Sequence, residues 1–261
     1  GHVCWMQHPE DIAVMCDKSA CQALLEANGV SVPRTLGVIT GLDDLIARMD
    51  VAGQNRVFLK LCHGSSASGT IALERSAGRI QAFSTAKLSL GPTGVTLYNW
   101  RAVTRYQDLR EIRTLVDTAS RHRVTVEAWI PKAGWCGRRF DVRIVVIDGR
   151  ARHVVARLAE GPFTNLQFGA LRASADELRD HLGKTVFGAM CEEAERAMAC
   201  FPRSLYGGVD VLLDSHKLRP YILEVNAFGD LLPSIRHQDR STYDWEIAKI
   251  MERNQVSTIG T

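Results

Sequence analysis

Two carboxylates and an amide near the C-terminus form the group of side chains that most clearly suggests chemistry. Asp210 lies in the apolar run 208–214, and Glu224 and Asn226 lie in the run 221–226. Both runs predict buried strands, and the short polar segment between them predicts a hairpin. Glu224 and Asn226 are two residues apart, so they project from the same face of a strand. The three side chains can therefore converge, and an all-oxygen set of this kind suits Mg²⁺.

A plainer interpretation of these acids is that they are solvated strand ends or partners of Arg219. An isolated pair of acids with this spacing would favour that interpretation. Asp210 and Glu224 instead lie inside apolar runs, where an unpaired charge is costly. Their surroundings therefore favour a metal site.

A loop of small residues follows a second predicted strand, which ends near Lys60. The loop, 63–69, lets backbone N–H groups approach an anion closely, and its serine hydroxyls add donors. Those serines are Ser65, Ser66 and Ser68. The loop is interpreted as a flexible flap over the phosphates of a nucleotide, and a surface hairpin turn is the alternative.

The spacing of Gly64 and Gly69 in this loop is that of a Walker A motif. That motif requires a lysine after the second glycine, where this chain has Thr70, and Lys60 precedes the loop instead. No strand–loop–helix pattern surrounds the loop. The sequence therefore excludes a P-loop NTPase.

Helices and strands alternate irregularly along the chain. The patterns predict helices at 17–29, 42–49, 107–120, 175–199 and 243–251, and strands at 57–61, 70–73, 124–130, 140–147, 151–158, 208–214 and 221–226. Ser174 and Glu177 form a capping box, and Asp148-Gly149 is a hairpin turn. Gly and Pro residues indicate a loop within 84–105. The mixture predicts an α+β fold with largely antiparallel sheets.

The composition narrows the class of protein. The chain has 261 residues, 46% of them hydrophobic, with a net charge of +3 that is spread along the sequence, so no basic block indicates a nucleic-acid partner. No apolar run has membrane-spanning length, and the N-terminal residues lack the apolar core that a signal peptide would show. The seven cysteines contain no C-x-x-C pair, which excludes a zinc or disulfide framework and favours a cytoplasmic protein.

Taken in order, these features resemble the ATP-grasp superfamily. Three more segments carry the resemblance: the opening Asp17-Lys18 … Gly29-Val30-Ser31-Val32-Pro33, the hinge-like Val126-Glu127-Ala128-Trp129-Ile130, and Phe140-Asp141-Val142-Arg143 followed by Arg157 and Thr164-Asn165. The last of these is similar to the C-lobe of RimK-like and glutathione-synthetase-like carboxylate–amine ligases. The resemblance covers roughly 17–240.

The resemblance implies two α+β lobes with mainly antiparallel sheets that clasp ATP. The N-lobe would span 17–126, and the C-lobe, with the metal site and a C-terminal helix, would span 127–261. The family carries a substrate-binding domain before its first lysine, where this chain has a remnant or linker at 1–16. That domain is expected to be missing or reduced, or to come from a partner chain.

The resemblance also assigns roles to single residues. Cofactor-binding positions would be Lys18 and Lys60 on phosphates, with Ser65, Ser66 and Ser68 in the flap, Glu127, Ala128 and Ile130 at the adenine hinge, and Asp141 on ribose. Metal ligands would be Asp210, Glu224 and Asn226, and the catalytic residues would be Arg143 and Arg157, which stabilise an acyl phosphate. Solvated strand arginines and a surface pairing for Glu127 are the plainer alternatives.

The expected activity is an ATP-dependent ligase that joins an amino acid or peptide carboxylate to an amine. Its cofactors would be ATP and Mg²⁺, with Mn²⁺ as a substitute, and its partners would be a small amino-acid or peptide substrate and either a second copy or a chain that supplies the N-terminal domain. Two alternatives remain open. One is an ATP-grasp kinase of a small molecule, and the other is a nucleotide-binding regulatory protein of the synapsin-like kind.

Overall fold

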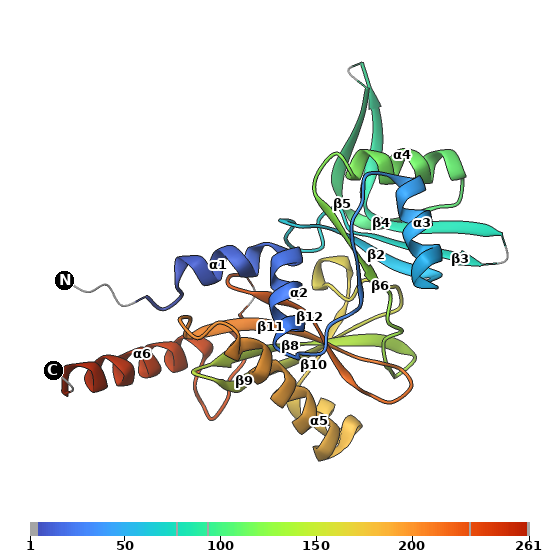
Figure 1. Ribbon diagram of the computed structural model, residues 1–261. Helices are drawn as coiled ribbons and strands as arrows, with labels where there is room; N and C mark the ends of the chain where they lie inside the picture. The colour runs from blue at the N-terminus through green and yellow to red at the C-terminus, as the bar shows by residue number, and fades with distance from the viewer. Residues whose placement is uncertain (1–4, 77, 93, 230, 260–261) are drawn as a thin grey trace. The chain divides into compact units, whose positions relative to one another are not determined.

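The chain folds into two α+β units in a computed structural model that describes residues 5–76, 78–92, 94–229 and 231–259 (Figure 1). Unit 1 comprises Gly1–Val32, Lys132–Glu160 and Leu171–Thr261, and unit 2 comprises Pro33–Pro131 and Gly161–Ala170. The strand pairs of the two main sheets are antiparallel, which confirms the predicted fold class. The lobe boundaries inferred from the resemblance, at 16/17 and 126/127, stay a prediction.

Unit 2 is built on a six-stranded sheet. Its strand order is β1 (Thr35–Val38), β6 (Val124–Ala128), β2 (Arg56–Leu61), β3 (Ile71–Ser76), β4 (Arg79–Gly91) and β5 (Gly94–Tyr106). Helices α3 (Leu42–Ala52) and α4 (Leu109–Ala119) pack on it through Leu45, Met49, Ile112 and Leu115, which share one apolar core with the sheet. A short 3₁₀ turn, η1 (Leu166–Phe168), also belongs to this unit.

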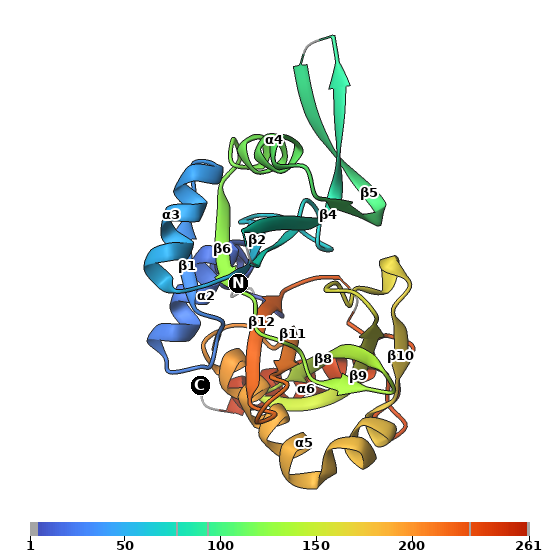
Figure 2. The same ribbon diagram turned by 90° about the vertical axis from the view of Figure 1, so that its right-hand side faces the viewer.

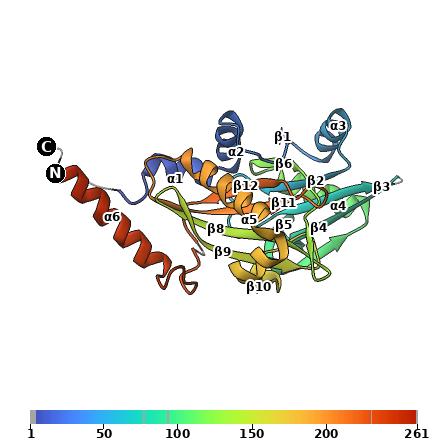
Figure 3. The ribbon, with the colours of Figure 1, turned by 90° about the horizontal axis from the view of Figure 1, so that it is seen from below.

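Unit 1 is built on a second sheet. Its strand order is β10 (Leu171–Ala173), β9 (Arg150–Ala159), β8 (Arg138–Ile147), β11 (Tyr206–Leu213) and β12 (Pro220–Asn226), and β7 (Gly134–Trp135) pairs with β8. Its helices are α1 (Pro9–Cys16), α2 (Lys18–Ala27), α5 (Ala175–Ala199) and α6 (Thr242–Ile259). Helix α6 packs through Trp245 against Val145 and Ile147 and then runs away from the sheet (Figures 1 and 3).

The two faces of the unit 1 sheet differ in character because successive strand residues point to opposite sides. On β8, the residues Phe140, Val142 and Ile144 enter the apolar core that is covered by α1, α2 and α5. Asp141 and Arg143 alternate with them and therefore point to the opposite face. That face carries most of the predicted site residues of this unit.

Most predicted elements are confirmed. Helix α5 has the predicted bounds and the Ser174–Glu177 capping box, and β8 and β9 are joined by Asp148-Gly149, both with positive φ. Helix α1 was not predicted. The structure describes no helix that is both long and apolar enough to cross a lipid bilayer.

The prediction of a loop within 84–105 is wrong. This segment is most of a long hairpin, β4–β5, which projects from the sheet of unit 2 (Figures 1 and 2). The misleading glycines, Gly91 and Gly94, are the last residue of β4 and the first of β5 and form the end of the hairpin. Leu88 and Leu97 pack against the core of the unit from opposite strands, a period-two signal that the Gly and Pro residues obscured.

A charged sheet face as the candidate functional site

The candidate site of unit 1 is a row of charged side chains across one face of its sheet. Arg143 on β8 lies opposite Asp210 on β11, and Asp210 lies opposite Glu224 on β12. Asp141 on β8 lies opposite Arg157 on β9. Strand register alone therefore places these five residues on the same face.

Short ion pairs join the central part of this row. Arg143 Nε donates to Asp210 Oδ1 at 2.5 Å, and its Nη2 donates to Oδ2 at 3.1 Å. Arg157 Nη2 lies 3.2 Å from Asp210 Oδ1, while its Nε donates to Asp141 Oδ1 at 2.8 Å. Lys132 Nζ donates to Asp141 Oδ2 at 3.0 Å. Three cations thus surround two carboxylates.

The network of ion pairs is buried at all five of its residues, and this burial affects the pKa of each carboxyl group. The five residues are Lys132, Asp141, Arg143, Arg157 and Asp210. Burial by itself raises the pKa of Asp210, but the nearby Arg143 and Arg157 lower it more, so that its pKa lies well below the usual range. Asp141 follows the same pattern, with burial opposed by Arg157 and Lys132, and its pKa is also lowered. The carboxylates are therefore charged at neutral pH.

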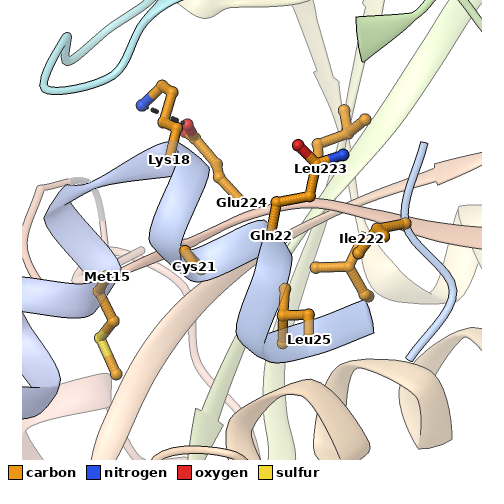
Figure 4. Close-up of a pocket in the computed structure, with 9 residues that line it drawn as sticks. Met15, Lys18, Cys21, Gln22, Leu25, Ile222, Leu223 and Glu224 are labelled. Atoms are coloured by element: carbon orange, nitrogen blue, oxygen red, sulfur yellow. Dashed lines mark ion pairs between the residues drawn. The ribbon is translucent and has the colours of Figure 1, made fainter. Parts of the chain in front are cut away.

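At the edge of the row, Glu224 pairs with Lys18 at the start of α2. The two side chains point toward each other, and Lys18 Nζ lies 3.0 Å from Glu224 Oε2 (Figure 4). Both are partly exposed, at 17% and 26% for the two side chains. Together with residues of α2 and β12 they line a hollow of about 10 Å³, which has room for about one water molecule.

The predicted metal ligands have the donor chemistry of a Mg²⁺ site. As ligands, Asp210 and Glu224 would offer carboxylate oxygens, and Asn226 would offer its amide oxygen. The Nδ2 of Asn226 donates to the Gly208 carbonyl at 3.1 Å, so its Oδ1 is the atom that could bind a metal. Asp210 would share its oxygens with the two arginines. Within the described ranges, no cluster of three or more His, Cys, Asp or Glu residues is placed to hold a metal. The set therefore depends on the amide.

In unit 2, the predicted phosphate-binding Lys60 pairs with Glu127. Lys60 Nζ donates to Glu127 Oε2 at 2.7 Å, and the two side chains are only 14% and 5% exposed. Glu127 is therefore a buried partner and not a surface acid. A nucleotide phosphate would give Lys60 a second anionic partner.

The hinge-like segment of unit 2 presents one unused backbone donor. The N–H of Ala128 donates to the Arg34 carbonyl, and that of Trp129 donates to the Arg56 carbonyl. The Ile130 N–H makes no hydrogen bond to any residue that the structure describes. This is the donor that the resemblance assigns to the adenine edge.

The flap is held by residues that the sequence did not single out. Asn99 on β5 accepts from the Gly69 N–H at 3.1 Å and donates to Ser68 Oγ at 2.6 Å. Thr85 on β4 donates to the Ala67 carbonyl at 2.5 Å, and Gln167 donates to the carbonyl of Ser66. Asn99 and Thr85 belong to the segment mistaken for a loop, so their role was not visible.

The flap backbone is bent in an unusual way. Ser66 and Ala67 have φ of 52° and 54°, in the left-handed region that residues with a side chain rarely adopt. Such strain persists only where the surroundings impose it, and it concentrates at ligand-binding turns. Together with the anchors, it indicates a preformed loop.

The structure groups the predicted residues by unit. Unit 1 holds Lys18, Asp141, Arg143, Arg157, Asp210, Glu224 and Asn226, and unit 2 holds Lys60, Ser65, Ser66, Ser68, Glu127, Ala128 and Ile130. Lys132 joins the first group without having been predicted, because it follows Pro131 outside any periodic run.

This protein matches known proteins by its fold and not by its sequence. No family model and no curated protein matches this sequence. Solved structures do match: a D-alanine–D-alanine ligase from Bacillus anthracis, at 14% identity and a TM-score of 0.56, is matched over 92% of this chain and 67% of that one. VanG D-Ala:D-Ser ligase from Enterococcus faecalis gives 16% identity, a TM-score of 0.57 and coverages of 92% and 62%.

The chain has the ATP-grasp fold. A biotin carboxylase from Campylobacter jejuni, at 14% identity and a TM-score of 0.57, is matched over 86% of this chain and 43% of that one. At such identities the likeness concerns the fold alone. The fold predicted by resemblance is confirmed, and the chain spans only part of these ATP-grasp proteins.

The buried network makes a prediction about acid. Asp210 has a lowered pKa in the folded state, so its contribution to stability is complete above the unfolded pKa, about 3.9, and is lost as the pH falls below that value. We expect Asp210→Asn to lower the free energy of unfolding at pH 7 by about 3–5 kcal/mol, because it leaves the buried arginines undercompensated. The variant should also lose less stability than the parent between pH 5 and pH 3.

Urea denaturation over this pH range measures both effects. Glu160→Gln is the matched control, because Glu160 is 82% exposed and pairs with Arg138 at 3.5 Å. Such an exposed pair contributes about 0–1 kcal/mol. Equal stability of the Asp210 variant and the parent at pH 7 would contradict the network.

Proposed function

We propose that the protein is an ATP-dependent ligase that joins the carboxylate of an amino acid or peptide to an amine through an acyl phosphate. The observation that carries the proposal is the buried network on the unit 1 sheet, in which Arg143 and Arg157 are held by Asp210 and Asp141. ATP would be used with Mg²⁺, and Mn²⁺ is the substitute.

Stability alone is a weak reason to bury these charges. Desolvating ions is expensive, and well-packed apolar residues often stabilise a fold as well or better. A guanidinium that is held rigidly by neighbouring acids is, by contrast, a suitable partner for negative charge that develops during a reaction. In the proposed reaction, Arg143 and Arg157 stabilise the acyl phosphate and the intermediate that forms when the amine attacks.

The remaining residues would hold the nucleotide. Lys60 would contact a phosphate, with hydroxyl and N–H donors from the flap, and the Ile130 N–H would bind the adenine edge together with the Ala128 carbonyl. Asp141 holds Arg157 and Lys132 in position through both of its oxygens, and its contact with ribose stays a prediction.

Glu224 and Asn226, with Asp210, would hold the magnesium ion. When bound, such an ion neutralises charge on phosphate oxygens. Lys18 already lies beside Glu224 and would balance the charge of that carboxylate or turn to a phosphate.

A product assay tests the proposal. The protein is incubated with ATP, Mg²⁺ and pools of amino acids and short peptides, and the products are identified by mass spectrometry. ADP together with a new amide supports a ligase. ADP with a phosphorylated metabolite would instead identify a kinase, and ATP binding without turnover would identify a regulatory protein.

The arginine network predicts a specific kinetic defect. Arg157→Lys keeps the charge but loses the planar fork that contacts both Asp141 and Asp210. We expect kcat to fall by about a hundred-fold, the scale seen when one such electrostatic donor is lost. The affinity for an ATP analogue should change less than three-fold, since Lys60 and the hinge are untouched.

Steady-state kinetics and calorimetry separate these effects, and a melting curve shows whether the variant folds. A folded variant with the turnover number of the parent would remove Arg157 from the reaction. Loss of nucleotide affinity at unchanged kcat would make it a ground-state phosphate ligand instead.

The role proposed for Lys60 predicts weaker nucleotide binding. Lys60→Met should lower the affinity for an ATP analogue by about ten- to a hundred-fold, because a charge-assisted contact is worth roughly 1.5–3 kcal/mol. Lys184→Met, which removes an exposed charge from α5, is the control and should bind normally. Equal affinities of the two variants would show that Lys60 serves only Glu127.

A further inference from the structure

The long hairpin of unit 2 carries exposed side chains that the proposed nucleotide site does not require. Strand β5 ends the sheet order, and its residues from Tyr98 to Val103 are all exposed. Three of them are large and apolar: Tyr98 is 58% exposed, Trp100 50% and Val103 38%. Both views of the hairpin show it standing away from the body of the unit (Figures 1 and 2).

A β-bulge interrupts the pairing of β4 and β5 in this exposed stretch. Ser84 pairs with Thr104 and Ala86 pairs with Asn99, so the four residues Trp100 to Val103 lie opposite Thr85 alone. Bulges re-aim side chains and are common beside functional sites. This bulge turns Trp100 and Arg101 toward a hollow of about 600 Å³ that is also lined by the flap serines, Gln167 and Phe168.

The charge of the hairpin has one sign. From Arg79 to Tyr106, the span of the hairpin, the sequence contains four basic residues and no acidic one. Arg101 has no ion-pair partner among the residues that the structure describes, and Lys87 lies over the Trp100 ring at 5.1 Å from its centroid. A cationic, aromatic surface that is exposed in this way suits a partner with carboxylates.

The bulge is linked directly to the flap. Asn99, the residue before the bulge, holds the flap through Gly69 and Ser68, as described above. A ligand seated on Trp100 and Arg101 would therefore lie beside the loop proposed to cover the nucleotide phosphates. That position suits a substrate and not a distant partner.

We propose that the bulge and the hollow beside it bind an acidic peptide segment of the substrate, with Arg101 contacting a carboxylate and Trp100 packing against the peptide. The inference rests on the proposed ligase function and narrows its substrate class. A second copy of the chain fits less well, because two such hairpins would bring like charges together. A single-stranded nucleic acid would also meet cations and aromatic rings, but the chain has no basic block and a net charge of only +3.

Fluorescence anisotropy of labelled peptides tests this site without ATP. The probe alternates glutamate and alanine, and the matched peptide has glutamine in place of each glutamate. The parent protein should bind the acidic peptide at least about ten-fold more tightly, as expected when charge-assisted bonds are lost. Arg101→Gln should lose about ten-fold for the acidic peptide, and Trp100→Leu should also weaken binding.

Arg110→Gln is the control, because it removes the same charge from an exposed position on α4 of the same unit. An equal loss in Arg110→Gln and Arg101→Gln would mean nonspecific attraction and would overturn the site. Equal affinity for the acidic and glutamine peptides would overturn it too. Tighter binding of an oligothymidine of equal charge would also overturn it. So would a dimer, detected by analytical ultracentrifugation, that forms through the hairpin.

A separate measurement distinguishes this inference from the proposed function. An ATP analogue should bind Arg101→Gln within about two-fold of the parent, because Arg101 is not part of the proposed nucleotide contacts. If the parent binds no ATP analogue, the proposed function fails whatever the peptides do. If it binds the analogue and turns over but ignores acidic peptides, only the peptide site fails.

Discussion

The compensation of buried charge on one sheet face is the constraint on which unit 1 depends. Strand alternation sends Asp141 and Arg143 to the face opposite the apolar core, and register brings Arg157 and Asp210 to meet them. Helices α1, α2 and α5 cover the apolar face, and the charged side chains lie on the opposite face. Once two carboxylates are buried there, the fold must supply cations, and it supplies Arg143, Arg157 and Lys132.

Unit 2 also pairs a cation with a buried carboxylate, although only one such pair is involved in its candidate site. Lys60 is only 14% exposed and pairs with the buried Glu127, which holds its flexible ammonium group in place. The flap is fixed similarly, by side chains of β4, β5 and η1 that bond to its backbone and to one serine. In both units, groups able to bind anions are oriented in advance, which reduces the ordering cost of binding.

The sequence predicted what depends on local pattern. Acids inside apolar runs revealed Asp210 and Glu224 as cross-strand neighbours, and the capping box gave the start of α5. The ion pairs between distant strands could not be predicted from the sequence. Nothing near Asp210 in sequence indicates that two arginines from other strands will neutralise it. The β4–β5 hairpin was missed because Gly91 and Gly94 act as turn signals inside a period-two pattern.

We propose that the charged face of unit 1 serves ATP chemistry, and Glu224 is the residue whose substitution tests this most directly. Glu224 is partly exposed and its partner Lys18 is too, so Glu224→Gln should fold normally. The decisive measurement is the rate of ADP formation by this variant at saturating Mg²⁺ with substrates that the parent uses. A loss of about a hundred-fold or more is predicted, because one charge fewer weakens the hold on the metal. A rate within a few-fold of the parent would contradict the claim.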